Sequence, residues 1–215
     1  MEPISGAYIL VDRILLLTRF LILAFMFISS LALEGSSPSK QFQQKLEELG
    51  LKNHLPFLSV DSSSQKMFLF SGEGDLMETY VISTAEKGMG EEQGTWQTPR
   101  GLHRIASKIG AGKPKYTIFE GRRSTGRVWH SRMSLKDDMI LTRILRLEGL
   151  EDTFNRGKNE LGKNVDSYKR LIYIHGTNEE ELLGTARSHG CIRMESDQLI
   201  KLFDLISSSC LVWLE

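Results

Sequence analysis

The sequence predicts a mainly β domain with one or two helices packed on it. Its 215 residues are enough for one domain of ordinary size plus an appendage. Most patterned segments are short runs with the alternation or the continuous apolarity of strands, and Gly, Pro and Asn separate them. One convincing helical pattern occurs near the C-terminus, and there is no internal repeat. The predicted strands cover residues 66–71, 78–84, 103–107, 115–120, 139–148, 170–175 and 210–214.

The N-terminal segment is typical of an export signal or a membrane anchor. Residues 20–33, FLILAFMFISSLAL, form an uncharged apolar run that follows Arg13 and Arg19. This length suits the apolar core of a signal peptide, and the small residues near its end could be read by a signal peptidase. Extension of the run to residues 14–33 would instead give an uncleaved anchor. Residues 1–33 are therefore predicted to direct export, and both alternatives stay open.

A linker is expected between this segment and the folded domain. Residues 34–65 are rich in Ser at both ends, which breaks any regular pattern there. Between these ends, residues 41–51 could form a short amphipathic helix that stops before Pro56. We therefore predict that the domain spans residues 66–215.

The charge balance points to no polyanionic partner. The chain has 27 Lys and Arg against 27 Asp and Glu, so we expect no binding to nucleic acid. Charge is uneven locally, because residues 100–132 contain nine basic residues and the single acid Glu120. This stretch would suit a ligand that carries carboxylates, or it could be a solvated basic surface.

The predicted helix lies near the C-terminus of the domain. Ser196 can cap its N-terminus, and acidic residues on either side suit the positive end of the helix dipole. A helix here would present one apolar face to the sheet. The residues at this spacing are Leu199, Leu202, Phe203 and Ile206.

The motif with the most chemical content is SHGCIR, residues 188–193. It places one of only two cysteines two residues after one of only five histidines. If the segment is extended, His189 and Cys191 project from the same face, while Gly190 leaves the backbone uncovered. Such a display suits a reactive thiol, and a metal site is the alternative.

A second histidine ends the predicted strand RLIYIHGT, where Gly176 begins a loop that leads back to Ser188. A thiol is mostly protonated at neutral pH, so a nucleophilic cysteine needs a base or a positive environment. His175 and His189 are both candidates for the base. An imidazolium beside Cys191 would lower the pKa of its thiol.

The two cysteines could also form a disulfide, which an exported chain would permit. Cys210, however, begins the apolar run CLVWL, where a free cysteine behaves as a small buried hydrophobe. The pair therefore need not be equivalent. The alternatives are a disulfide between Cys191 and Cys210, or one reactive and one buried thiol.

Three motifs together resemble the L,D-transpeptidase family, also called the YkuD or ErfK family. They are TPRG at residues 98–101, IHGT at 174–177 and SHGC at 188–191, and they occur in the order seen in that family. The resemblance implies an L,D-transpeptidase-like β-sandwich that covers residues 66–215. Two departures concern the substrate: Arg193 stands where many members have Asn, and the loop between 175 and 188 is short.

The resemblance also implies a role for each matching residue. Cys191 would attack a carbonyl of a peptidoglycan stem peptide and form a thioester, with His175 as the base. The carbonyl of Gly176 would orient that imidazole, and the backbone of His189, Gly190 and Cys191 would line the oxyanion hole. The residues assigned to substrate binding are Ser188, Thr177 and Arg193, the last of which could instead pair with Glu195.

These roles predict an exported enzyme of cell-wall crosslinking or remodelling, in the bacterial periplasm or cell envelope. The acyl acceptor would be an amine of another stem peptide or a lysine of an envelope protein. If water is the acceptor, the enzyme is an L,D-carboxypeptidase or endopeptidase. No cofactor is expected. Other readings are a zinc hydrolase that uses His175, His189 and Cys191 as ligands, or a wall-binding module without activity.

Overall fold

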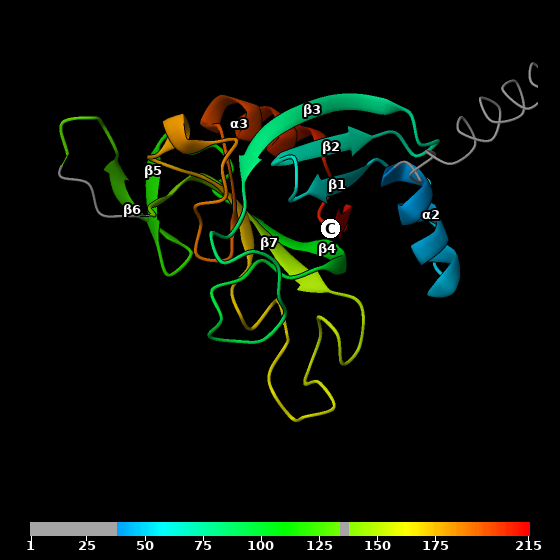
Figure 1. Ribbon diagram of the computed structural model, residues 1–215. Coiled ribbons are helices and arrows are strands. Elements are labelled where there is room, and N and C mark those ends of the chain that lie inside the picture. The colour runs from blue at the N-terminus through cyan, green and yellow to red at the C-terminus, as the bar shows by residue number, and fades with distance from the viewer. Residues whose placement is uncertain (1–37, 134–137) are drawn as a thin grey trace, which may run out of the picture. The chain divides into compact units, whose positions relative to one another are not determined.

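The computed structural model describes residues 38–133 and 138–215. The predicted export segment, residues 1–33, lies outside the described residues. The described part is mainly β, with ten strands and two α-helices, so the predicted fold class is confirmed (Figure 1). None of the helices described is long and apolar enough to cross a membrane.

The strands are β1 (Phe57–Asp61), β2 (Lys66–Phe70), β3 (Leu76–Ser83), β4 (Gly101–Ile109), β5 (Thr117–Glu120), β6 (Arg123–Val128), β7 (Ile140–Gly149), β8 (Tyr173–Gly176), β9 (Ile192–Met194) and β10 (Leu211–Leu214). The helices are α2 (Pro38–Glu48) and α3 (Ser196–Leu205), and a short 3₁₀ helix spans Glu180–Leu182.

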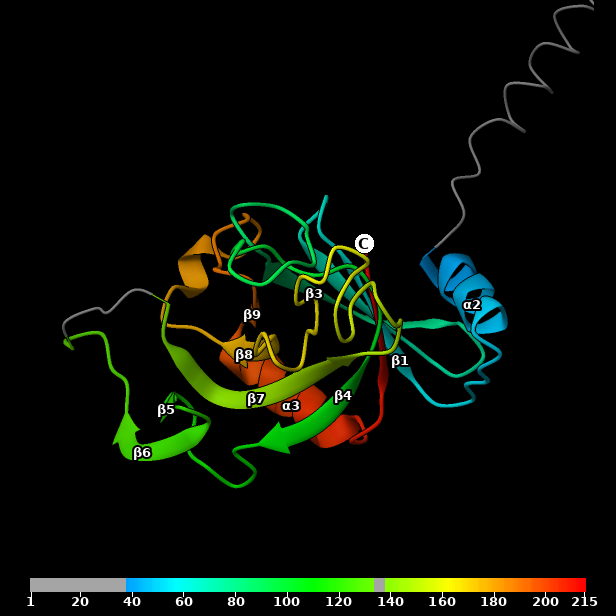
Figure 2. The same cartoon turned by 90° about the horizontal axis from the view of Figure 1, so that it is seen from below.

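All ten strands belong to one hydrogen-bonded sheet, in the order β4-β10-β1-β2-β3-β9-β8-β7-β5-β6. Because β4 pairs with β7 as well as with β10, the sheet curls back on itself and its two halves enclose a common core. The hairpin of β5 and β6 is attached to the start of β7. Helix α3 packs against β7 and β8 (Figure 2).

The C-terminal helix buries the face that its sequence predicts. Leu199, Leu202 and Phe203 are at most 3% exposed and lie in the largest apolar cluster. The N-cap differs from the prediction, because Glu195 rather than Ser196 accepts the free N–H groups of Asp197 and Gln198. The Ser196 hydroxyl instead accepts a hydrogen bond from Thr142 at 2.9 Å, in a position with no exposure to solvent.

The domain boundary predicted at Lys66 is too late. Strand β1 lies inside the sheet, where Leu58 pairs in parallel with Val212 of β10 and antiparallel with Leu69 of β2. Its short sequence stands between two stretches typical of a linker, and its partner β10 lies at the far end of the domain. The pairing is therefore a long-range contact that local sequence does not reveal.

Helix α2 begins and ends earlier than the predicted helix at residues 41–51. Phe42 of α2 stacks on Phe57 of β1 with 3.7 Å between ring centroids and is fully buried. Two further strands were not predicted, for different reasons. Strand β6 has an exposed and weakly apolar sequence, and β9 has only three residues.

The pairing of β8 with β9 places residues of the IHGT motif beside the residues that follow the SHGC motif. The strands are parallel, with Ile174 opposite Ile192 and His175 opposite Arg193. Side chains alternate between the faces of a sheet, so one face carries the two isoleucines and the other carries His175 and Arg193. The isoleucines lie in the main core, which leaves the opposite face for polar chemistry.

Burial of His103 predicts an acid-sensitive fold. Its ring is fully buried between the Gly101 carbonyl and the Ser167 hydroxyl, and burial lowers its pKa to about 4. The unfolded chain takes up this proton near pH 6.5, as an ordinary imidazole does, so stability should fall between about pH 6.5 and 4. This pKa difference corresponds to about 3 kcal/mol of unfolding free energy.

Chemical denaturation at a series of pH values would measure the effect. His103→Gln should flatten the acid limb of the stability profile, whereas the same change at exposed His54 should leave the profile unaltered. The slope that persists in His103→Gln would come from the other buried histidine, His175, whose pKa burial also lowers, and at lower pH from carboxylates with a lowered pKa, such as Asp138. An unchanged slope in His103→Gln would contradict the assignment.

Candidate active site

The candidate nucleophile is a half-buried thiol at the start of β9. The Cys191 thiol donates a weak hydrogen bond to the carbonyl of Leu171, with 3.5 Å between the sulfur and the oxygen. Burial raises the pKa of Cys191 to about 12, because the thiolate would lose its hydration. The residue therefore rests as a neutral thiol.

The candidate base is the buried imidazole of His175, which is 1% exposed. Its Nδ1 lies 2.8 Å from the carbonyl oxygen of Gly176. A carbonyl only accepts, so Nδ1 carries the proton and Nε2 keeps the lone pair that a base needs. Burial also lowers the pKa of His175, which keeps the ring neutral at neutral pH. The contact with Gly176 is the one that the family resemblance implies.

The pKa shifts of Cys191 and His175 correct one expectation from the sequence. An imidazolium was expected to lower the pKa of the Cys191 thiol, but the thiol pKa is raised and the pKa of His175 is lowered. Desolvation acts on both groups, and it disfavours the charged form of each. The pair at rest is therefore neutral thiol and neutral imidazole, and proton transfer has to accompany the attack.

The segment that carries the thiol is a folded turn rather than an extended strand. Gly190 has a φ of +124°, a conformation that side chains rarely permit, and β9 begins only at Ile192. The buried Ser188 hydroxyl donates to the carbonyl of Cys191 at 2.5 Å and accepts from the N–H of Gly190 at 3.2 Å. The Gly190 amide is therefore turned inward, away from the role of oxyanion donor that was expected.

The TPRG motif supports this turn from a distant part of the chain. The hydroxyl of Thr98 donates to the carbonyl of Gly190 at 3.1 Å and accepts from the N–H of Ala85 at 3.0 Å. Thr98 and Ser188 are both buried. Ser188 thus supports the turn through its hydroxyl, and it also lines one of the hollows beside His189.

Arg193 and Thr177 were also expected to bind substrate, and their burial argues against it. Arg193 is 2% exposed, with its guanidinium 2.6 Å from a carboxylate oxygen of Glu179 and 2.7 Å from one of Asp138. The alternative pair with Glu195 is absent from the ion pairs of the described residues, where Arg193 pairs with Asp138 and Glu179 instead. Thr177 is fully buried, and its hydroxyl accepts from the N–H of Glu179.

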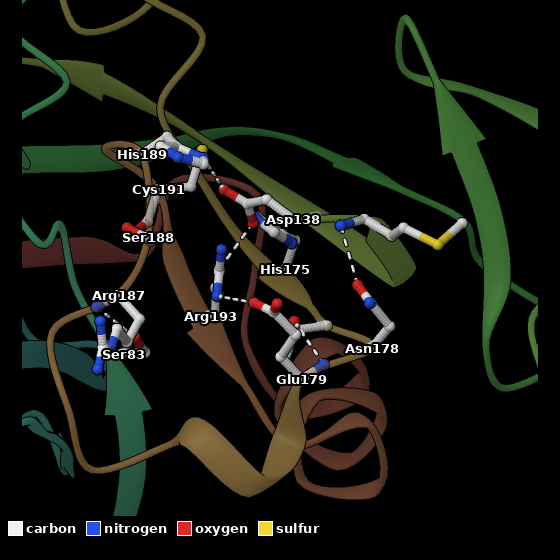
Figure 3. A network of polar contacts seen from close by, with 12 residues as sticks. Ser83, Asp138, His175, Asn178, Glu179, Arg187, Ser188, His189, Cys191 and Arg193 are labelled. Carbon is white, nitrogen blue, oxygen red and sulfur yellow. Dashed lines mark hydrogen bonds and ion pairs between the residues drawn. The ribbon is translucent and has the colours of Figure 1, made fainter. Parts of the chain in front are cut away.

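Asp138 is the site residue that sequence reasoning missed. One carboxylate oxygen lies 2.8 Å from Nδ1 of His189, and the other faces Arg193 (Figure 3). Burial alone would raise the pKa of Asp138, but its hydrogen bonds and charged neighbours outweigh this and lower the pKa. The carboxylate is therefore ionised. Its only signal in the sequence was an acidic pair in an otherwise basic stretch, residues 121–147.

Two hollows meet at His189. One, of about 280 Å³, is lined by Trp96, Lys169, Arg170, Leu171 and His189, among others. The second, of about 380 Å³, is lined by Glu86, Lys87, Trp96, Ser188 and His189. Trp96 meets the His189 ring edge-on at 5.7 Å between centroids, so these two side chains belong to both hollows.

One guanidinium donates three hydrogen bonds to the backbone of the loop that carries Trp96. Arg170 donates to the carbonyls of Gly90, Glu91 and Gln97, at 3.1, 2.6 and 2.6 Å. Its donors are therefore engaged by the backbone of this loop. Of the two cations that line the hollow of about 280 Å³, the exposed Lys169 is the one better placed to meet a carboxylate of a ligand.

Neither alternative use of the cysteines matches the structure. Cys191 and Cys210 are both free thiols, and Cys210 is 2% exposed in the main core. No group of three or more His, Cys, Asp or Glu side chains in the described ranges is arranged to hold a metal ion. The side chains of His175, His189 and Cys191 are thus not arranged as the ligands of a zinc ion, as the zinc-hydrolase hypothesis requires.

Comparison with known proteins places this site in a family. The profile of the YkuD family, described as the L,D-transpeptidase catalytic domain, matches residues 56–213. The chain therefore belongs to the YkuD family and carries an L,D-transpeptidase catalytic domain. The match includes β1, in agreement with the earlier start of the sheet.

Individual proteins match more weakly. A stretch of 37 residues is 51% identical to YqjB of Bacillus subtilis (strain 168), a provisionally assigned L,D-transpeptidase, and covers 17% of this chain and 21% of YqjB. An L,D-transpeptidase from Xylanimonas cellulosilytica DSM 15894 is 14% identical over 80% of this chain and 68% of its own, with a TM-score of 0.46. The L,D-transpeptidase from Mycobacterium smegmatis is 13% identical over 74% of this chain and 58% of its own, with a TM-score of 0.43.

The raised pKa of Cys191 predicts slow alkylation. Iodoacetamide should modify Cys191 at least about tenfold more slowly than a free cysteine at pH 7, since only the thiolate reacts. The rate should continue to rise above pH 8.5, where a free thiol begins to level off. Mass spectrometry of a Cys210→Ala variant would follow Cys191 alone. A rate that reaches its plateau below pH 7 would show a thiolate at rest and contradict this reading.

Proposed function

We propose that this protein is an L,D-transpeptidase that acts on peptidoglycan stem peptides through a thioester on Cys191. The main observation in support is the neutral imidazole of His175. Its Nδ1–H donates a hydrogen bond to the Gly176 carbonyl, so the lone pair of Nε2 is free to act as a base. This base lies on β8 opposite Arg193 of β9, which stands two residues after Cys191 in the sequence. The arrangement is that of a nucleophile with an oriented base.

The first half-reaction would release the terminal D-Ala of a tetrapeptide stem. As the sulfur of Cys191 bonds to the carbonyl carbon of the diaminopimelate L-centre, the thiol proton passes to Nε2 of His175. The same proton then passes to the nitrogen of D-Ala as the amide C–N bond breaks. The product is an acyl-enzyme thioester and free D-Ala, and the imidazole is neutral again.

Charge on the carbonyl oxygen needs donors in this step. Because the Gly190 amide is bonded to Ser188, we assign the oxyanion contacts to the backbone N–H groups of His189 and Cys191. A neutral resting pair suits this mechanism, because the thiolate forms only where these donors and the substrate carbonyl can use its charge.

The acceptor in the second half-reaction determines which of two activities the enzyme has. An amine of a second stem peptide, or a lysine of an envelope protein, would give a crosslink. Water would give an L,D-carboxypeptidase or endopeptidase from the same thioester. We favour transfer to an amine, because the family profile that the chain matches is described as that of an L,D-transpeptidase catalytic domain.

We further propose that the protein works in the bacterial periplasm or cell envelope. The support for this location is the apolar run at residues 20–33, preceded by two arginines. Peptidoglycan lies outside the cytoplasmic membrane, so an enzyme that acts on it has to be exported.

The nucleophile assignment can be tested with the two thiols. Cys191→Ala should abolish the acyl-enzyme seen by intact-protein mass spectrometry with a disaccharide-tetrapeptide, and turnover should fall by on the order of a thousandfold or more. Cys210→Ala should keep most of the activity, since that thiol is in the core and its loss costs only packing. Turnover retained in Cys191→Ala would sink the assignment.

A further inference from the structure

The second histidine of the site has a carboxylate partner of its own. Nδ1 of His189 lies 2.8 Å from Asp138, which is separated from it by 51 positions in the sequence. An ionised carboxylate only accepts, so Nδ1 of His189 carries a proton and donates it to Asp138. The lone pair of the neutral ring is therefore on Nε2, which makes no hydrogen bond to any of the described residues.

The two imidazoles differ in what they can reach. The ring of His175 is 1% exposed and can serve only a group already bound beside it. The side chain of His189 is 56% exposed, yet Asp138 and the edge of Trp96 hold its ring from two sides. His189 is thus an oriented base that is open to an incoming molecule.

The position of His189 suits the acceptor rather than the donor. Leu171, whose carbonyl accepts from the Cys191 thiol, lines the hollow of about 280 Å³, so we take this hollow as the one next to the thiol. His189 and Trp96 also line the second hollow, of about 380 Å³. A molecule bound in that second hollow would therefore meet the His189 imidazole.

We propose that His189, positioned by Asp138, is the general base that deprotonates the ammonium group of the acyl acceptor. This inference rests on the proposed function and concerns its second half-reaction. An alkylammonium has no lone pair, so it cannot attack the thioester until it loses a proton. Water needs no such step before it attacks.

The proton balance requires two acceptors. Conversion of an ammonium into an amide releases two protons, while the new C–N bond forms and the C–S bond breaks. The first proton goes to Nε2 of His189 and then to solvent. The second leaves the tetrahedral adduct through His175 and restores the Cys191 thiol. Because His175 has a single free nitrogen, it cannot hold both protons at once.

Asp138 has a second partner, and this provides a matched control. Its carboxylate also faces the buried Arg193, as does the carboxylate of Glu179. Asp138→Asn and Glu179→Gln therefore each remove one of the two carboxylate charges that face the Arg193 guanidinium. Only Asp138→Asn also weakens the partner of His189.

The experiment follows a preformed acyl-enzyme as it divides between an amine and water. In Asp138→Asn, transfer to an alkylamine such as the diaminopimelate side chain of a second stem peptide should fall about 100-fold relative to hydrolysis. Formation of the acyl-enzyme should change much less. Glu179→Gln should keep the ratio of the parent protein. Transfer to hydroxylamine, which is unprotonated at neutral pH, should survive in Asp138→Asn.

Each contrary result has a distinct meaning. Equal losses in Asp138→Asn and Glu179→Gln would overturn the proposal in favour of simple support of Arg193. Equal losses with the alkylamine and hydroxylamine would overturn it in favour of an effect on orientation. If Asp138→Asn does not fold, His189→Gln keeps the Arg193 ion pairs and has to show the same selective loss. Absence of any acyl-enzyme in the parent protein would instead overturn the proposed function itself.

Discussion

The buried guanidinium of Arg193 is the constraint on which the site depends. A cation with 2% exposure is tolerated only because opposite charges compensate for its lost hydration. Asp138 and Glu179 supply them from two segments, one that precedes β7 and one that follows β8. Both segments are thereby tied to β9. The carboxylate that neutralises Arg193 also orients His189, so electrostatic support of the fold and placement of an imidazole at the site are the same interaction.

Desolvation sets the chemistry of the candidate pair. The same loss of hydration that raises the pKa of the Cys191 thiol lowers the pKa of His175. A neutral thiol and a neutral imidazole place no further charge beside the buried Arg193. They also keep Cys191 protonated, and therefore unreactive, before substrate binds. In the proposed mechanism, charge separation would depend on substrate, since only the substrate would bring the carbonyl oxygen that the backbone N–H groups can stabilise. This restraint would suit the proposed enzyme, whose thiol would have to survive between encounters with its substrate.

The three motifs of the family meet in one hydrogen-bonded unit. Thr98 of the first motif holds the carbonyl of Gly190, and Ser188 holds both ends of the same turn. The φ of Gly190 explains why this position has no side chain. The second motif enters through β8, whose parallel pairing with β9 sets His175 opposite Arg193. Some residues of these motifs, such as Thr98 and Ser188, thus stabilise the turn at Gly190 through hydrogen bonds.

The sequence by itself determined the mainly β class, the apolar face of α3 and the residues that would carry the chemistry, because periodicity and short motifs are local properties. The tertiary structure alone decided which residues are buried. Strand β1 and the short β9 exist through pairing with distant strands, and Asp138 reaches His189 across 51 positions. Burial turned Arg193 from a predicted ligand for substrate into an internal ion pair and reversed the expected direction of the Cys191 pKa. Hydration and long-range charge depend on what surrounds a side chain in space, and no local pattern in the sequence records that environment.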